Sequence, residues 1–184
     1  MIEYLYVAAA ILLAITLGLW LSWTANRLDR MHHRIELARA SLDARLLHRS
    51  GTALELATTG ALDPARSLVL VDAAHAARAS GAESFESAES NLSQALRAVF
   101  VDEREVHDLG RHHAGDLLRE LAGDCRKLLL ARRFHNDVVA SARALRSRRR
   151  VRWLRLAGRA ADLQTVDLDD EPPAALVAAG PRGT

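Results

Sequence analysis

An uninterrupted apolar run at the N-terminus, from Tyr4 to Ala25, precedes an amphipathic pattern that continues through most of the chain. The run contains no charged residue, and as a helix it would extend roughly 33 Å, about the thickness of the hydrocarbon core of a bilayer. Tyr4 and Tyr6 lie at one end and Trp20 and Trp23 at the other, where aromatic rings favour the two membrane surfaces. The pattern predicts one transmembrane helix.

A cleaved signal peptide is the alternative interpretation of this run. No Lys or Arg precedes it, it is longer than the core of a signal peptide, and Trp23 stands where cleavage needs a small residue. We therefore predict an uncleaved anchor. Arginines occur only after the run, beginning with Arg27, Arg30, Arg34 and Arg39, and such residues favour the cytoplasmic side. The N-terminus is predicted to lie outside and the remaining chain in the cytoplasm.

Apolar residues at three- and four-residue spacing continue beyond the anchor and predict a helix that runs to about residue 59. Its apolar stripe comprises Leu28, Met31, Ile35, Ala38, Leu42, Leu46, Ala53 and Ala57. Gly60 follows as the first stop signal. Asp63 and Pro64 then start a second helix as its N-cap and first residue, and Ser80-Gly81 ends it.

Residues 68–72 of this second helix, Leu-Val-Leu-Val-Asp, also fit a buried strand that opens a nucleotide-binding unit. No Gly-rich phosphate loop follows this stretch, and the sequence contains no second strand pattern that would pair with it. We therefore expect a helix here.

Two further helices are predicted, and the second of them is the longest after the first. The third begins near Ser84, carries Leu92, Leu96, Val99 and Phe100 at helical spacing, and weakens over residues 102–108 before a corner at Leu109-Gly110. The stripe of the fourth comprises Leu117, Leu121, Asp124, Leu128, Ala131, His135, Val138, Ala142 and Leu145. Spacing sustained over this length requires packing against other helices, with Leu121, Leu128, Val138 and Leu145 in the interior.

These patterns predict an all-α protein in three parts. Residues 1–25 form the transmembrane anchor, and residues 26–160 form a cytoplasmic antiparallel four-helix bundle with long helices. Residues 161–184 are acidic at first and then rich in Pro, Ala and Gly. We predict that this tail is disordered, because such a composition buries too little apolar surface to fold.

Composition narrows the classes of function. The net charge is only +2 and aromatic residues make up 4%, so neither a basic field nor a stacking pattern favours nucleic acid. Cys125 is the only cysteine, which excludes a disulfide framework, suits the reducing cytoplasm and favours packing as a small hydrophobe. The sequence contains no nucleophile–base pair or phosphate loop, so we expect neither catalytic residues nor a cofactor.

The histidines offer the strongest candidate for a metal site. The chain has eight, and His112 and Asp116 are four residues apart, with His113 beside them. A tight site needs three or four converging ligands, and no recognised spacing supplies them here. A solvated polar face is the preferred interpretation, so no metal is predicted. A metal-dependent enzyme built on the His112/His113/Asp116 cluster is the alternative function.

Two polar residues lie on the apolar stripe of the fourth predicted helix. His135 is expected to be a core histidine with a satisfied hydrogen bond. Three interpretations of Asp124 stay open: it caps a bend, it pairs with Lys127, or it pairs with Arg126.

Three segments are similar to signatures of one protein family. Residues 131–139, ARRFHNDVV, resemble the A-R-x-x-Y-N-x-x-V signature of the LemA family, with His135 at the position of its tyrosine. Residues 35–49 resemble its W-x-x-I-D-x-x-L-x-x-R segment, and residues 89–96 resemble its E-x-x-L-x-x-A-L stretch. The resemblance covers about residues 1–158 and implies a bacterial inner-membrane protein with a cytoplasmic antiparallel four-helix bundle. The family has no established catalytic residues, so the resemblance implies none.

The most basic stretch of the chain follows the fourth predicted helix. Arg152, Arg155 and Arg159 fall on one helical face and Trp153 lies among apolar residues, which is typical of a short helix in a membrane surface. Anionic lipid contributes about 1 kcal/mol for each nearby arginine. Four helices bring the chain back toward its anchor, so we predict that this stretch docks on the inner leaflet. The predicted contact residues are Arg148, Arg149, Arg150, Arg152, Trp153, Arg155 and Arg159.

These expectations describe a membrane-anchored scaffold or interaction module at the bacterial inner membrane, without catalytic activity. Its expected partners are the membrane, through one helix and anionic inner-leaflet lipid, and a protein that the sequence does not identify. Nucleic acid is not expected as a partner, and a homo-oligomer is left open.

Overall fold

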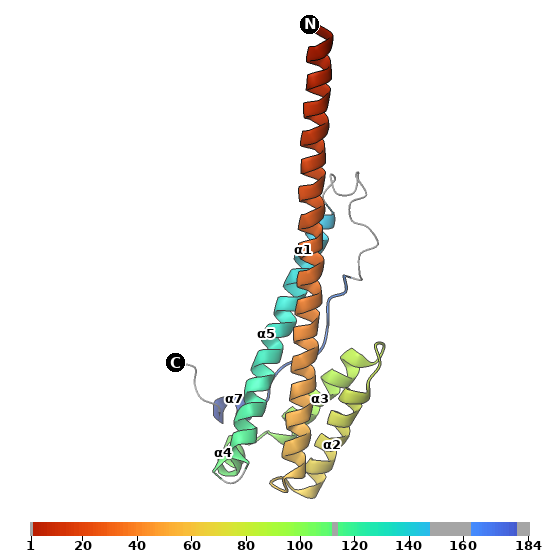
Figure 1. Ribbon diagram of the computed structural model, residues 1–184. Coiled ribbons are helices and arrows are strands. Elements are labelled where there is room, and N and C mark those ends of the chain that lie inside the picture. The colour runs from red at the N-terminus through yellow and green to blue at the C-terminus, as the bar shows by residue number, and fades with distance from the viewer. Residues whose placement is uncertain (1, 112–113, 148–162, 180–184) are drawn as a thin grey trace. The chain divides into compact units, whose positions relative to one another are not determined.

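The computed structural model describes residues 2–111, 114–147 and 163–179, and all regular structure in these ranges is helical. The helices are α1 (Ile2–Thr58), α2 (Pro64–Ala79), α3 (Phe85–Val99), α4 (Glu103–Gly110), α5 (Gly115–Arg146) and α7 (Ala174–Ala179), as labelled in Figure 1. The predicted all-α class is therefore confirmed for the described ranges. The alternative of a strand at residues 68–72 is wrong, because these residues lie within α2.

Local signals set the helix boundaries much as predicted. α1 ends at Thr58, and Gly60 follows with a φ of 76°, a left-handed conformation that glycine adopts without strain. The Asp63 carboxylate caps α2 by accepting hydrogen bonds from the backbone N–H groups of Ala65 and Arg66 at 3.0 and 3.1 Å. Residues 102–108, where the helical pattern of the third predicted helix weakens, belong largely to a separate short helix, α4.

The chain divides into two compact units, and α1 and α5 contribute to both. The larger unit comprises Ala38–Asn136 and Thr165–Thr184, and the smaller comprises Met1–Leu37 and Asp137–Gln164. In the larger unit α1, α2, α3 and α5 share one apolar core, and successive helices run in opposite directions (Figure 1). The leucines of this core that are 0% exposed are Leu56, Leu70, Leu92, Leu96 and Leu121. This unit is therefore an antiparallel helical bundle.

Part of the C-terminal tail belongs to the packed structure of the larger unit. Val166 and Leu168 are buried in a second apolar cluster together with Leu42 and Leu46 of α1 and Leu128 of α5. α7 adds Ala175 and Leu176 to the main core. The prediction of a disordered tail is therefore wrong for residues 165–179, because apolar residues spaced along this segment reach the bundle.

The predicted interior positions of α5 are correct in its first half and shifted in its second. Leu121 and Leu128 are 0% exposed. Farther along the helix Val139 is 0% exposed, whereas Val138 and Leu145 are only half-buried. His135 and Ala142 of the predicted stripe are buried as well, so the column Leu121, Leu128, His135 and Ala142 keeps its heptad spacing along the whole helix. The second buried column is Leu118, Cys125 and Val139, one residue beyond the predicted positions Leu117 and Val138.

The smaller unit has an apolar cluster of its own, formed by Ile35, Val139, Ala142 and Leu163. Every described side chain from Glu3 to Trp23 is exposed, including Leu13 at 70% and Leu19 at 67%.

Within the part of the chain whose placement is described, no helix is long and apolar enough to span a membrane. Several side chains of the predicted transmembrane run lie outside the described residues, namely those of Leu5, Ala8, Leu21, Thr24 and Ala25. The transmembrane helix stays a prediction.

Candidate functional site

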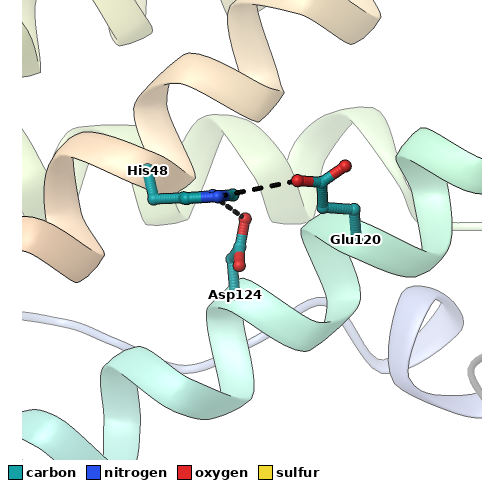
Figure 2. Close-up of side chains that lie close together, drawn as sticks. All are labelled: His48, Glu120 and Asp124. Atoms are coloured by element: carbon teal, nitrogen blue, oxygen red, sulfur yellow. Dashed lines mark hydrogen bonds and ion pairs between the residues drawn. The ribbon is translucent and has the colours of Figure 1, made fainter.

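Three polar side chains from α1 and α5 meet in the larger unit, and Figure 2 shows how they face one another. We refer to His48, Glu120 and Asp124 as the His48 cluster. His48 Nδ1 lies 2.7 Å from Asp124 Oδ2, and His48 Nε2 lies 3.6 Å from Glu120 Oε1. One imidazole of α1 is therefore placed between two carboxylates that lie one turn apart on α5.

Asp124 is the buried member of this cluster. Its side chain is 1% exposed, whereas those of His48 and Glu120 are 50% and 48% exposed. Asp124 Oδ2 also accepts a hydrogen bond from the Thr52 hydroxyl at 3.0 Å, and Oδ1 lies 3.7 Å from Lys127 Nζ. Of the interpretations left open for Asp124, the pairing with Lys127 is therefore present, together with contacts to α1 that the sequence did not indicate.

Arg49, which follows His48 on α1, forms a buried ion pair with Glu89 of α3. Arg49 Nη2 donates to Glu89 Oε2 at 2.7 Å and Nη1 donates to Ser93 Oγ at 2.8 Å. The side chains of Arg49 and Glu89 are 2% and 4% exposed, and this burial raises the pKa of Glu89 although the Arg49 charge opposes the shift. Two of the segments that resemble LemA signatures meet here, since Arg49 ends one and Glu89 begins the other.

A second polar site joins the bundle to its own C-terminal tail. We call residues 165–171, Thr-Val-Asp-Leu-Asp-Asp-Glu, the acidic segment. Arg132 of α5 binds Asp170 with two parallel hydrogen bonds, from Nε at 2.7 Å and from Nη2 at 2.9 Å. Arg97 of α3 binds both oxygens of Asp169 and also donates to the carbonyl of Glu171 at 2.8 Å. Two arginines thus hold two consecutive aspartates.

Other side chains of α3 and α5 bind the backbone of the acidic segment. Asn136 makes two hydrogen bonds with Val166, donating to its carbonyl and accepting from its N–H, both at 2.9 Å. Ser90 Oγ accepts from the Asp169 N–H at 3.0 Å, and Glu86 Oε1 accepts from the Asp167 N–H at 2.9 Å. The residues that contact the segment are Glu86, Ser90, Arg97, Arg132 and Asn136, and we call them the α3–α5 surface.

The electrostatics of this surface follow from these pairs. The hydrogen bonds from Arg97 hold the pKa of Asp169 below its ordinary value of 3.8. The hydrogen bond to Asp170 in turn raises the pKa of Arg132. Both pairs are only partly exposed, with side-chain exposures of 29% and 32% for Arg97 and Asp169 and of 21% and 9% for Arg132 and Asp170. Bidentate pairs at this depth are specific for carboxylates.

The structure leaves most of the site residues predicted from sequence outside its described ranges. This is the case for His112 and His113 and for the predicted membrane contacts Arg148, Arg149, Arg150, Arg152, Trp153, Arg155 and Arg159. The side chain of Asp116 is 94% exposed and pairs with Arg119. His135 and Cys125 are buried on α5, as expected for core residues, and burial raises the pKa of the Cys125 thiol.

The residues that sequence reasoning missed did carry a signal. Arg49 lies on the otherwise apolar face of α1, and a charge in such a position needs a partner from another helix. In the tail, Val166 and Leu168 alternate with Asp167 and Asp169, a pattern typical of an extended segment with one buried face. For Asp124 the sequence indicated Lys127 but not the contacts with α1, and for Arg49 and the acidic segment it identified no partner.

The comparisons with known proteins leave the family of this chain open: no protein-family model, curated protein or solved structure matches it.

Proposed function

We propose that this protein is a membrane-tethered helical interaction module that binds extended acidic segments of partner proteins. The observation that carries the proposal is the α3–α5 surface, which binds a segment of this kind from the same chain. The partner would present an extended peptide in which apolar and acidic residues alternate.

The contacts of the surface divide into two kinds. Asn136, Ser90 and Glu86 bind backbone groups, so they fix the path of a peptide whatever its side chains. The two arginines select carboxylates, because the planar guanidinium matches both oxygens of a carboxylate at once. Burial of Val166 and Leu168 adds an apolar requirement at alternate positions. Together these contacts recognise the class of peptide rather than one sequence.

A partner must compete with the acidic segment of the chain itself. A segment tethered to its binding site acts at an effective concentration on the order of millimolar. A free peptide of the same affinity therefore binds only when the tethered segment is released. The bundle would bind partners under conditions that weaken its own Arg97–Asp169 and Arg132–Asp170 pairs.

The membrane tether rests on the N-terminal run. Tyr4 to Ala25 carries no charge, and the described side chains of this run are exposed, so they require an apolar environment to cover them. The arginines that follow the run support an orientation with the bundle in the cytoplasm, and the resemblance to the LemA family supports the bacterial inner membrane. The basic stretch from Arg148 to Arg159 would add contacts with anionic lipid. We propose no catalytic activity.

A peptide-binding experiment with full-length protein tests the proposal. The probe is a fluorescent peptide with the sequence of residues 163–179, and its binding is followed by fluorescence anisotropy. In Asp169→Lys/Asp170→Lys protein the tethered segment is released by charge repulsion, so the probe should bind. Wild-type protein should bind it at least tenfold more weakly, because its surface is occupied.

A charge-swapped variant provides the control. Arg97→Glu and Arg132→Glu, added to the two aspartate substitutions, restore opposite charges between the tail and the bundle but reject the wild-type probe. This variant should fold and bind no probe. If the released variant keeps its helical circular dichroism but binds no probe, the α3–α5 surface is not a peptide-binding site and the proposed function is wrong.

A further inference from the structure

The two ring nitrogens of His48 face two different carboxylates. Where Asp124 is ionised it can only accept, so in the 2.7 Å contact between His48 Nδ1 and Asp124 Oδ2 the hydrogen lies on Nδ1. In the neutral imidazole the other nitrogen, Nε2, is then an acceptor with a lone pair. This lone pair faces Glu120 Oε1, a second acceptor, across 3.6 Å (Figure 2).

Two acceptors that face each other can share a bound metal ion, which takes the place of a proton on Nε2. A bound divalent metal ion lies about 2.0–2.2 Å from nitrogen and oxygen ligands, so two ligands at a tetrahedral angle are about 3.4 Å apart. The separation of 3.6 Å between His48 Nε2 and Glu120 Oε1 is close to this value. The two side chains therefore need little movement to share one ion.

We infer that the His48 cluster binds a divalent transition-metal ion of the zinc class, a binding site beyond the proposed peptide surface. His48 Nε2 and Glu120 Oε1 are its two protein ligands, and water fills the remaining positions, so the site is weaker than a tight one with three or four protein ligands. Asp124 is a positioning residue, because it fixes the tautomer and the orientation of the imidazole through Nδ1, as carboxylates do behind many metal-binding histidines. Imidazole is a poor ligand for the hard ions Mg²⁺ and Ca²⁺, which sets the class of ion.

The surroundings of the cluster support a prepared site. Asp124 is almost fully buried and is held by Thr52 at 3.0 Å, so the group that orients His48 is itself fixed. Lys127 Nζ lies near Oδ1 of Asp124, so it leaves Oδ2, the oxygen that contacts the imidazole, to His48 and Thr52. His48 and Glu120 are half-exposed, so an ion from solvent can reach them.

Titration of the full-length, tag-free protein with Zn²⁺ tests this site by isothermal calorimetry, and Co²⁺ absorption spectra report nitrogen and oxygen ligation independently. His48→Gln and Glu120→Gln should each weaken Zn²⁺ binding at least tenfold. Asp124→Asn should weaken it by about 10- to 100-fold, the usual effect of losing such a positioning partner. Mg²⁺ should not compete with Zn²⁺ for the site.

Matched controls separate the site from other histidines. His75 is exposed on α2, so His75→Gln should bind Zn²⁺ like wild type, and so should His112→Ala/His113→Ala. Since Asp124 is buried, thermal unfolding of Asp124→Asn without metal distinguishes a loss of the site from a loss of the fold. The inference is overturned if wild-type protein binds no Zn²⁺, if His48→Gln binds it as wild type does, or if only the His112→Ala/His113→Ala variant loses it.

Discussion

Leu128 and Leu130 lie two residues apart on α5 but have opposite environments. Leu128 is 0% exposed within the cluster that includes Val166 and Leu168, whereas Leu130 is 63% exposed. Leu128→Ala should lower the free energy of unfolding by about 2–5 kcal/mol, because it removes buried surface and leaves a cavity. Leu130→Ala should change it by less than about 0.5 kcal/mol. Urea denaturation of the two variants measures both; equal effects would mean that the register of α5 is wrong.

The buried pair of Arg49 and Glu89 predicts a non-additive response to mutation. Arg49→Met should destabilise the protein by about 3–5 kcal/mol, because it leaves the Glu89 carboxylate buried without its partner. Arg49→Met/Glu89→Met removes both charges and should recover most of this loss, as replacement of a buried pair by apolar residues is often neutral. A double-mutant cycle, measured by chemical denaturation, gives the coupling free energy between Arg49 and Glu89. A double variant less stable than Arg49→Met would contradict the prediction.

At the scale of the helix, the start of α5 depends on a glycine. A Cβ at residue 115 would overlap the backbone carbonyl oxygen of Gly110 at the end of α4. Gly115→Ala should therefore destabilise the protein by about 1–3 kcal/mol. Gly123 of the same helix has room, since the nearest atom to its Cβ is the flexible end of Lys127 at 4.0 Å. Gly123→Ala should raise the free energy of unfolding by about 0.5–1 kcal/mol. The melting temperatures of Gly115→Ala and Gly123→Ala should therefore shift in opposite directions.

The acidic segment should make stability depend on pH. Arg97 lowers the pKa of Asp169 in the folded state, so the unfolded chain takes up the proton first as pH falls. The stabilisation is present above the unfolded pKa near 3.8 and is lost as pH drops through the lower folded value. Asp169→Asn should therefore be less stable than wild type at pH 6, and the difference should shrink at pH 3. Denaturation at both pH values checks this, with the exposed Asp72→Asn as a control that should show no such change.

At the scale of the whole molecule, the proposed topology places the two ends of α1 on opposite sides of a membrane. Val101 is 75% exposed in the larger unit, and the native Cys125 is buried, so an engineered cysteine reports its own location. Val101→Cys should react with a membrane-impermeant maleimide only after lysis, whereas Glu3→Cys should react in intact cells. Strong labelling of Val101→Cys without lysis would contradict the cytoplasmic location of the bundle.

The sequence by itself determined the helices α1, α2, α3 and α5. Their starts and stops depend on neighbours only, as with the Asp63 cap and the left-handed Gly60, and the buried faces follow from apolar periodicity. These are local effects, which a single sequence contains. The same periodicity placed Leu121 and Leu128 correctly on the buried face of α5. It did not distinguish the apolar neighbours Val138 and Val139, and only packing decided that Val139 is the fully buried one.

Only the tertiary structure decided which polar groups meet. His48 and Asp124 are separated by 76 positions, Arg49 and Glu89 by 40, and Arg97 and Asp169 by 72. Such pairs depend on how helices are rotated and aligned against one another, which no local pattern specifies. The order of the tail has the same origin: its composition favours disorder, but the partners in α3 and α5 offset the entropy of ordering residues 165–171.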